Sequence, residues 1–280
     1  MTSTMGWAPL TLKAGSTELS AFERNGPDDR APVVLLHGAG GNALTWTTIT
    51  PAFTGRRVLL LDMPGHGLSP KPSRWDLDDT ADRVARAVQG WLGDAHAIWG
   101  GHSWGGKVAG MVAAASPSRC RGLLLFDPSP SASLPVDVEE FVDGTWGVEM
   151  QPYASPESAA EAARAQRHWQ PWDDETAAAF RHGLAQHEDG SWSLRPTRED
   201  LVALATATLH LDATEMLAKA AALPVLLLIA EESTAWQGVT NMLVYPTAAR
   251  MVIAGNHWIH QCNRMAVIGA VKEWLSRIAA

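Results

Sequence analysis

A chain of 280 residues, of which 46% are hydrophobic, is long enough to bury one large core. Its formal net charge of −8 and the lack of a basic cluster argue against nucleic acid or an anionic membrane surface as a partner. Residues 1–10 do not resemble a signal peptide, no stretch reaches the roughly 18 apolar residues of a membrane span, and Cys120 and Cys262 alone form no disulfide framework, so we expect a soluble, cytoplasmic protein.

The first half of the chain alternates between apolar runs and helical patterns. Short continuous apolar runs such as 32–36 are typical of strands that are buried on both faces. In chain order, we expect strands at 17–24, 32–36, 57–61, 96–99 and 122–126, and helices at 42–53, 78–92 and 107–115. Strands that alternate with helices predict a mostly parallel sheet with helices on both faces, whose functional residues gather at the carboxyl ends of the strands.

One turn of this pattern carries a candidate nucleophile. Between the 96–99 strand and the 107–115 helix, the chain reads Gly101-His102-Ser103-Trp104-Gly105. Glycines two residues before and after a serine permit a sharp, strained nucleophile elbow, because residues without a Cβ let strand and helix approach closely. We expect this turn to expose Ser103, and we expect the neighbouring His102 to point away from the site as a packing residue.

The alternation of strands and helices stops after Asp127. Residues 128–223 are rich in alanine and helical in pattern, with no convincing buried strand; strands resume at 224–229 and 250–253, and a last helix covers 263–278. We predict an α/β core domain of residues 1–128 and 224–280, with a helical cap of residues 129–223 inserted into it. The cap carries four tryptophans, of which we expect most to anchor short helices and one or two to line a hydrophobic pocket that faces Ser103: Trp146, Trp169, Trp172 and Trp192.

A serine nucleophile requires a base and a group that orients the base. His257 follows the last predicted strand and is our predicted base, with His260 as the alternative. Two positions remain open for the orienting acid. Asp127 ends the strand after the nucleophile and precedes a proline that stiffens the backbone, whereas Glu231 and Glu232 end the strand after the cap. We favour Asp127, with Glu232 second.

The oxyanion hole requires two backbone N–H donors. One is expected from Trp104, which follows the nucleophile, and the other from the glycine-rich loop at 37–42. We choose Ala39 for the second donor, with Gly38 and Gly40 as alternatives. The loop lacks the sequence patterns of phosphate-binding loops, and no His-x-x-x-His pair predicts a metal site, so we expect neither a cofactor nor a metal.

Four motifs, in this order, resemble those of the α/β-hydrolase superfamily over essentially the whole chain. They are His37-Gly38, Asp62-Met63-Pro64-Gly65-His66-Gly67-Leu68-Ser69, Gly101-His102-Ser103-Trp104-Gly105-Gly106 and Gly255-Asn256-His257-Trp258. The resemblance implies an α/β-hydrolase fold with an eight-stranded, mostly parallel sheet, a helical cap between strands six and seven, and the order nucleophile, acid, histidine.

Two positions, those of the nucleophile and the acid, distinguish this chain from other branches of the superfamily. Haloalkane dehalogenases and epoxide hydrolases have an aspartate as nucleophile, where this chain has Ser103. Most members place the acid three residues after a glycine that follows strand seven, and Ser233 stands at that place here. Some branches, including fungal zearalenone lactonases, place the acid after strand six, which is the position of Asp127.

These residues predict a cofactor-free serine hydrolase of the esterase or lactonase-like branch. Its expected substrate is a small carboxylic ester or lactone with a hydrophobic body, and the aromatic cap suggests a bulky or ring-containing one. Two alternatives remain open: a C–C bond or amide hydrolase that uses the same triad, and a ligand-sensing receptor on a hydrolase frame. The sequence is compatible with a homo-oligomer and decides neither the substrate nor its stereochemistry.

Overall fold

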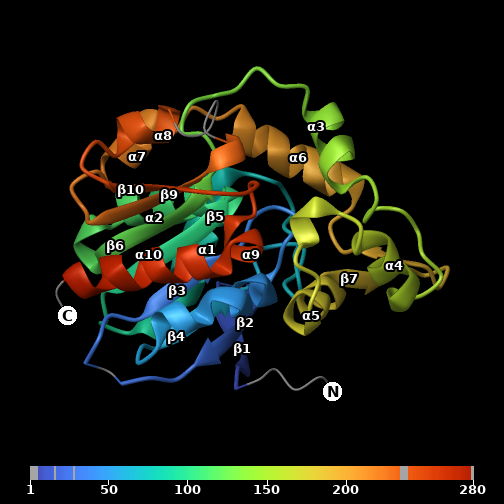
Figure 1. The fold of residues 1–280 in the computed structure, drawn as a ribbon, viewed down its shortest axis with the longest axis horizontal. Helices are drawn as coiled ribbons and strands as arrows, with labels where there is room; N and C mark the ends of the chain where they lie inside the picture. Colours follow the sequence, from blue (N-terminus) through green and yellow to red (C-terminus); the bar gives the residue numbers. More distant parts are fainter. Residues whose placement is uncertain (1–5, 16, 28, 234–238, 279–280) are drawn as a thin grey trace.

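The computed structural model describes residues 6–15, 17–27, 29–233 and 239–278, which form an eight-stranded sheet with helices on its faces (Figure 1). The strands lie in the order β1-β2-β4-β3-β5-β6-β9-β10. Pairs β1–β2 and β2–β4 are antiparallel, and the other pairs are parallel. Their bounds are β1 Ala8–Ala14, β2 Thr17–Arg24, β3 Val33–Leu36, β4 Val58–Leu61, β5 Ala97–Ser103, β6 Cys120–Pro128, β9 Val225–Ala230 and β10 Ala249–Ile253. The predicted eight-stranded, mostly parallel sheet is confirmed.

The central strands are buried on both faces because alternate side chains enter two separate cores. Val34 and Leu36 of β3 pack with helices α1 (Leu77–Leu92) and α2 (Trp104–Ala115). Val33 and Leu35 face the opposite way and pack with η1 (Ala43–Phe53) and α10 (Arg264–Arg277). The helix predicted at 42–53 forms as the 3₁₀ helix η1, with the Asn42 side chain accepting the Leu44 N–H at its start.

The cap differs in one respect from the expectation. It contains helices α3 Val138–Trp146, α4 Pro156–Ala163, η3 Arg167–Trp169, α5 Asp174–His182, α6 Arg198–Leu209 and α7 Thr214–Ala218. It also contains the two-stranded hairpin β7 Leu184–Gln186 and β8 Trp192–Leu194. Strands of three residues that are only partly buried leave no continuous apolar run in the sequence, which is why the hairpin was not predicted. The division into core and cap domains stays a prediction.

Side chains from the core hold cap helix α5 in place. Asn42 Nδ2 donates to the Ala179 carbonyl at 2.7 Å, and His182 Nε2 donates to Asp62 Oδ2 at 2.8 Å. Asp62 is fully buried and also accepts the N–H groups of Ala43 and Leu68. Burial alone would raise the pKa of Asp62, but these hydrogen bonds and the nearby His182 outweigh it and lower the pKa. The carboxylate therefore fixes the cap to the loop ends that follow β3 and β4.

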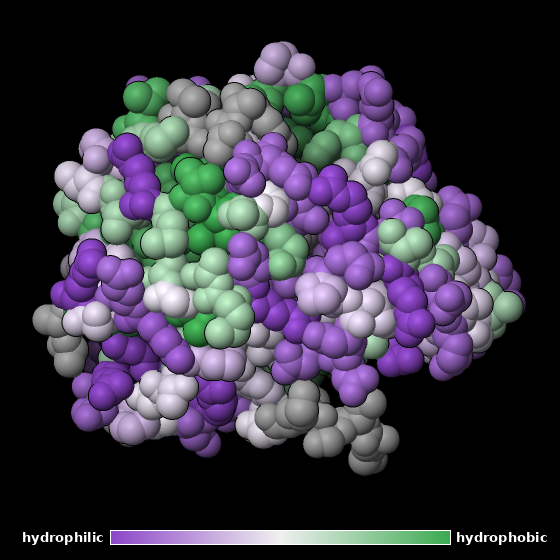
Figure 2. Space-filling model, in the orientation of Figure 1, coloured by the Kyte–Doolittle hydropathy of each residue, from purple (hydrophilic) through white to green (hydrophobic). Residues whose placement is uncertain are grey.

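The remaining short helices lie in the connections between the longer elements. They are η2 Pro117–Arg119, η4 Glu231–Ser233, α8 Val239–Val244 and α9 Ile259–Cys262. Figure 2 shows hydrophobic side chains gathered over the β10 side of the molecule and mostly hydrophilic ones over the cap. Leu243 of α8 and Met251 and Val252 of β10 are exposed. Among the described residues, none of the helices combines the length and apolar character that a membrane span requires.

Candidate active site

The predicted elbow is present between β5 and α2. Ser103 ends the strand with φ +51°, a backbone conformation that non-glycine residues rarely adopt. A Cβ on Gly101 would lie 2.2 Å from the Gly105 carbonyl oxygen, and a Cβ on Gly105 would lie 2.3 Å from that of Leu36. Both glycines are therefore required for the close approach of strand and helix that exposes Ser103.

Asp127 and His257 form a hydrogen-bonded pair at the carboxyl edge of the sheet. In the pairing of β5 with β6, His102 is opposite Phe126 and Ser103 is opposite Pro128, so Asp127 is the extra residue of a bulge, with φ +44°. The bulge turns the Asp127 side chain toward His257, whose Nδ1 donates to Oδ2 at 2.5 Å. The other carboxylate oxygen accepts the Ala230 N–H at 2.9 Å, so both oxygens of this fully buried carboxylate have partners.

The alternative acid and base lie elsewhere. Glu232 is exposed and pairs with Arg167 of the cap at 2.8 Å. His260 is buried against the ring of Trp46, with a centroid separation of 4.8 Å, and burial lowers its pKa from 6.5 to about 3. The structure therefore brings together Asp127 and His257, and it separates Glu232 and His260 from that pair.

Ser103 and His257 line the same cavity, whose volume is about 210 Å³. Within the described residues, the Ser103 hydroxyl contacts the Ser129 hydroxyl at 3.4 Å and makes no hydrogen bond to His257. The rest of the wall is mainly apolar and comes from α3, α6 and the segments next to the site: Ala39, His102, Trp104, Phe141, Thr145, Trp146, Leu204, Ala205, Thr208, Leu209 and Trp258. Of the four cap tryptophans, only Trp146 belongs to this wall, as expected for one or two of them.

The expectation that His102 points away from the site is wrong. Side chains alternate along β5, so His102 faces the side of the sheet where the segment 257–260 lies. Its Nε2 donates to the His257 carbonyl at 2.9 Å, and its ring lies 4.5 Å from that of His257. Burial holds the pKa of His102 well below its usual value, so this ring is a neutral support for His257.

The oxyanion loop follows β3, and one of its three candidate donors belongs to a residue that lines the large cavity. Gly40 donates its N–H to His66 Nε2 at 3.1 Å, and Gly41 donates to the Gly38 carbonyl at 3.0 Å, so these two N–H groups are already used. Ala39 lines the large cavity, and its N–H makes no hydrogen bond in the part of the chain that the structure describes; Gly38 does not line that cavity. Trp104 opens α2 and lines the same cavity, so its N–H lies in the first helical turn, where it has no intrahelical acceptor.

Two buried histidines hold this loop, a role that the sequence analysis missed. His37 Nδ1 donates to the Gly38 carbonyl at 2.7 Å, while His37 Nε2 accepts the Met63 N–H at 2.9 Å. His66 acts in the same way: its Nδ1 donates to the Pro64 carbonyl, and its Nε2 accepts the Gly40 N–H. Burial lowers the pKa of His37 to about 3 and that of His66 to about 4, so both rings stay neutral. The sequence offered one signal for this role: His37 belongs to the first of the four family motifs, and His66 belongs to the second.

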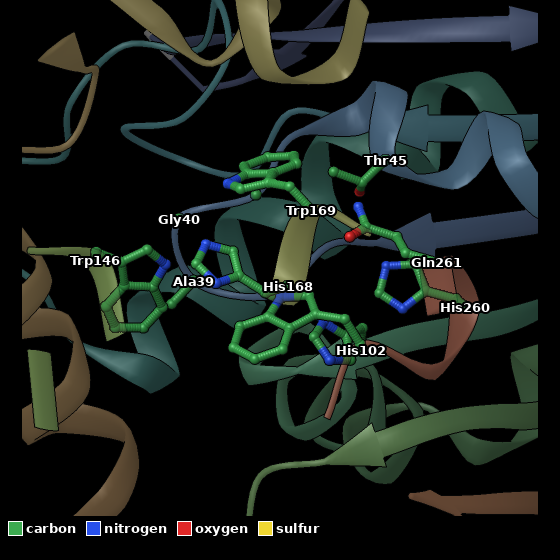
Figure 3. A pocket seen from close by; sticks show the side chains of 12 residues that line it. Ala39, Gly40, Thr45, His102, Trp146, His168, Trp169, His260 and Gln261 are labelled. Atoms are coloured by element: carbon green, nitrogen blue, oxygen red, sulfur yellow. The ribbon is translucent and has the colours of Figure 1, made fainter. Parts of the chain in front are cut away.

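A second, much smaller cavity of about 20 Å³ lies behind the oxyanion loop (Figure 3). It shares Ala39, His102, Trp146 and Trp258 with the large cavity. Its volume is that of about one water molecule. His260 Nδ1 and Gln261 Oε1 are buried here without a hydrogen-bond partner among the described residues. In the same described part, no three His, Cys, Asp or Glu side chains gather as metal ligands would.

The chain is similar to known proteins over parts of its length. Residues 31–193 match the model of a family described as alpha/beta hydrolase fold. Over 166 residues the chain is 30% identical to lipase LipV of Mycobacterium tuberculosis, covering 59% of this chain and 60% of the lipase. Over 105 residues it is 38% identical to the pimeloyl-[acyl-carrier protein] methyl ester esterase of Shewanella sp. strain MR-7, covering 38% of this chain and 36% of the esterase.

Other relatives extend the comparison. An acetyltransferase component of the acetoin cleaving system of Pseudomonas putida is 41% identical over 122 residues, which are 43% of this chain and 32% of that protein. The chain thus matches no more than 60% of the length of these curated relatives. The crystal structure of E-2-(acetamidomethylene)succinate hydrolase superposes with a TM-score of 0.82 at 20% identity, covering 96% of this chain and 99% of that one. A thioesterase domain from the curacin biosynthetic pathway superposes with a TM-score of 0.72 at 19% identity, covering 95% of this chain and 98% of that domain.

Proposed function

This chain belongs to the alpha/beta hydrolase fold family, and from that premise we propose that it is a serine hydrolase that cleaves a carboxylic ester through an acyl-enzyme. One observation carries the proposal: the hydrogen-bonded Asp127–His257 pair opens onto the same cavity as Ser103. A carboxylate that holds Nδ1–H leaves Nε2 as the free base of the imidazole. The names of the relatives, a lipase and a methyl ester esterase, support ester chemistry.

In the proposed reaction, rotation of the Ser103 hydroxyl away from Ser129 brings it to His257 Nε2. His257 takes the hydroxyl proton as Ser103 Oγ attacks the carbonyl carbon, and the resulting oxyanion is held by the N–H groups of Ala39 and Trp104. Collapse of this intermediate breaks the ester C–O bond, and His257 returns the proton to the leaving alcohol. His257 then deprotonates a water that attacks the acyl-enzyme, which releases the carboxylic acid and restores Ser103.

The wall of the cavity supports an uncharged, hydrophobic acyl group. Apart from the two histidines beside Ser103, the wall contains no side chain that titrates, and α3 and α6 contribute Phe141, Trp146, Leu204 and Leu209. Burial of apolar substrate surface against such side chains is favourable by roughly 25 cal/mol per Å². A lactone fits the same machinery, since the alcohol then stays attached to the acyl group; we propose it as a finer alternative within ester hydrolysis.

Covalent labelling and a substrate panel test the proposal. A fluorophosphonate probe should label the wild-type protein and the surface control Ser276→Ala, and Ser103→Ala should abolish the label. p-Nitrophenyl esters and lactones should then be turned over, and anilides and vinylogous diketones should be turned over poorly. Undiminished labelling of the Ser103→Ala protein would rule out Ser103 as the nucleophile. Faster turnover of diketones or anilides than of esters would favour C–C bond or amide hydrolysis instead.

A further inference from the structure

A buried lysine joins α2, the helix that follows Ser103, to α6, a cap helix that lines the large cavity. Lys107 lies in the first turns of α2, four residues after Ser103, and is only 1% exposed. Its Nζ donates to the carbonyl oxygens of Thr208 and Leu211, both at 2.7 Å. Thr208 is in the last turn of α6, so a core side chain binds the carboxyl end of a cap helix.

The chemistry of this contact is that of a helix terminus. The last four carbonyls of an α-helix have no intrahelical donor, and the helix dipole places negative charge there, so an ammonium group is a favourable partner. The Leu209 carbonyl at the same end accepts the Leu134 N–H at 2.8 Å. Burial lowers the pKa of Lys107 from 10.5 to about 8, partly opposed by the Asp212 carboxylate, so the group remains charged at pH 7.

The other end of α6 is also bound to the core. Asp200, in the first turn of the helix, accepts from Trp75 Nε1 at 3.0 Å and from Lys71 Nζ at 2.6 Å. Trp75 is in the segment that leads from β4 into α1, so α6 is held to the core at both termini. Between these two ends, α6 contributes Leu204, Ala205, Thr208 and Leu209 to the wall of the large cavity.

We propose that Lys107 is a positioning residue for substrate selection: by holding the carboxyl end of α6 at a fixed distance from the helix that follows Ser103, it sets how long an acyl group the cavity accepts. The inference rests on the proposed function, because it assigns the acyl group to the large cavity. Lys107 lies in the first turn of α2, which begins directly after Ser103, whereas Thr208 belongs to α6 and lines the cavity. Lys107 therefore links α2, which follows the nucleophile, to the carboxyl end of α6, and it does not contact the reacting atoms. We call this link the Lys107 strut.

Two variants probe the strut in different ways. Lys107→Met keeps an unbranched side chain that is one heavy atom shorter and removes its donors and its charge, so the end of α6 loosens. Lys107→Arg keeps donors and charge on a longer side chain, so the end of α6 moves outward. The matched control is Lys219→Met on the exposed surface after α7. Each protein is assayed with p-nitrophenyl acetate, butyrate, hexanoate and octanoate.

For Lys107→Met, we expect KM for hexanoate to rise about tenfold, with kcat and all acetate parameters within twofold of wild type, since the acetyl group is the shortest of the four and makes the least contact with α6. For Lys107→Arg, we expect the preferred acyl chain to lengthen. A merely structural lysine would lower activity on all four esters in parallel, and that result overturns the proposal. An unchanged chain-length profile, in whichever variant folds, overturns it as well.

A binding measurement separates this inference from the proposed function. Hexanoic acid is titrated calorimetrically into Ser103→Ala protein, with and without Lys107→Met, so that no turnover is needed. A tenfold weaker affinity in the double variant supports the strut even if the wild-type protein hydrolyses no ester. Equal affinities in the two proteins refute it even if the wild-type protein is an active esterase.

Discussion

Replacement of Asp127 by asparagine tests the proposed triad most sharply, because it changes charge and hydrogen-bonding character with almost no change of shape. In the wild-type protein, Asp127 accepts from His257 Nδ1 at 2.5 Å and from the Ala230 N–H at 2.9 Å. An asparagine that keeps its oxygen on Ala230 presents its NH₂ group to His257. His257 Nδ1 must then become an acceptor, and the proton moves to Nε2, where the base is needed.

The expected decrease in kcat follows from this tautomer change. In serine hydrolases, an asparagine at the acid position lowers kcat by about 10⁴, which corresponds to about 5.5 kcal/mol of barrier at 1.36 kcal/mol per factor of ten. Rotation of the amide by 180° does not rescue activity, because its NH₂ group would then face the Ala230 N–H. Two donors facing each other in a buried site cost about 1–3 kcal/mol.

The assay compares kcat for p-nitrophenyl butyrate in the wild type, Asp127→Asn and Glu232→Gln. Glu232 is the matched control, since it was the alternative acid in the sequence analysis and pairs with Arg167 at the surface. Thermal unfolding of each protein separates loss of catalysis from loss of fold. A kcat within tenfold of wild type for Asp127→Asn would refute the reasoning. Glu232→Gln losing activity by orders of magnitude would move the acid to the end of β9.

Three further predictions concern the oxyanion loop and the buried histidines. His66→Leu removes the acceptor of the Gly40 N–H and loosens the loop, so steady-state kinetics should show kcat lowered by about 10- to 10³-fold with KM nearly unchanged; an effect on KM alone would contradict this. Gly40→Ala places a Cβ 2.3 Å from Trp146 Nε1 at φ +71°, so urea unfolding should show a loss of at least about 1–2 kcal/mol, and an unchanged midpoint would contradict the clash. Burial lowers the pKa of His37 to about 3 and that of His66 to about 4, from 6.5, so the unfolded chain takes up protons before the folded one. Their contribution to stability is full above pH 6.5 and falls by about 1.4 kcal/mol per pH unit for each ring below it, down to the folded pKa values; equal unfolding free energies at pH 5 and pH 7 would refute this.

The central sheet was predictable because its signals are local. In β3, β4 and β9 every residue is buried, and a run of four to six apolar residues records this directly in the sequence. Gly101 also records a local requirement, because a Cβ there would clash with the Gly105 carbonyl oxygen four residues further on. The hairpin of β7 and β8 escaped prediction because strands of three residues give no period to detect. The direction of His102 was wrong because it depends on which segment covers that face of the sheet.

The sequence by itself determined the central strands and the helices between them, the strained turn at Ser103 and a short set of candidate acids and bases, because each depends on the spacing of neighbouring residues. Only the tertiary structure decided among those candidates. Asp127 and His257 are 130 residues apart along the chain and meet through a bulge that turns one side chain toward the other. The support of Gly40 by His66 and the contact of Lys107 with α6 were likewise decided by packing. A hydrogen bond between distant segments depends on how the whole chain folds, and no local pattern of residues records it.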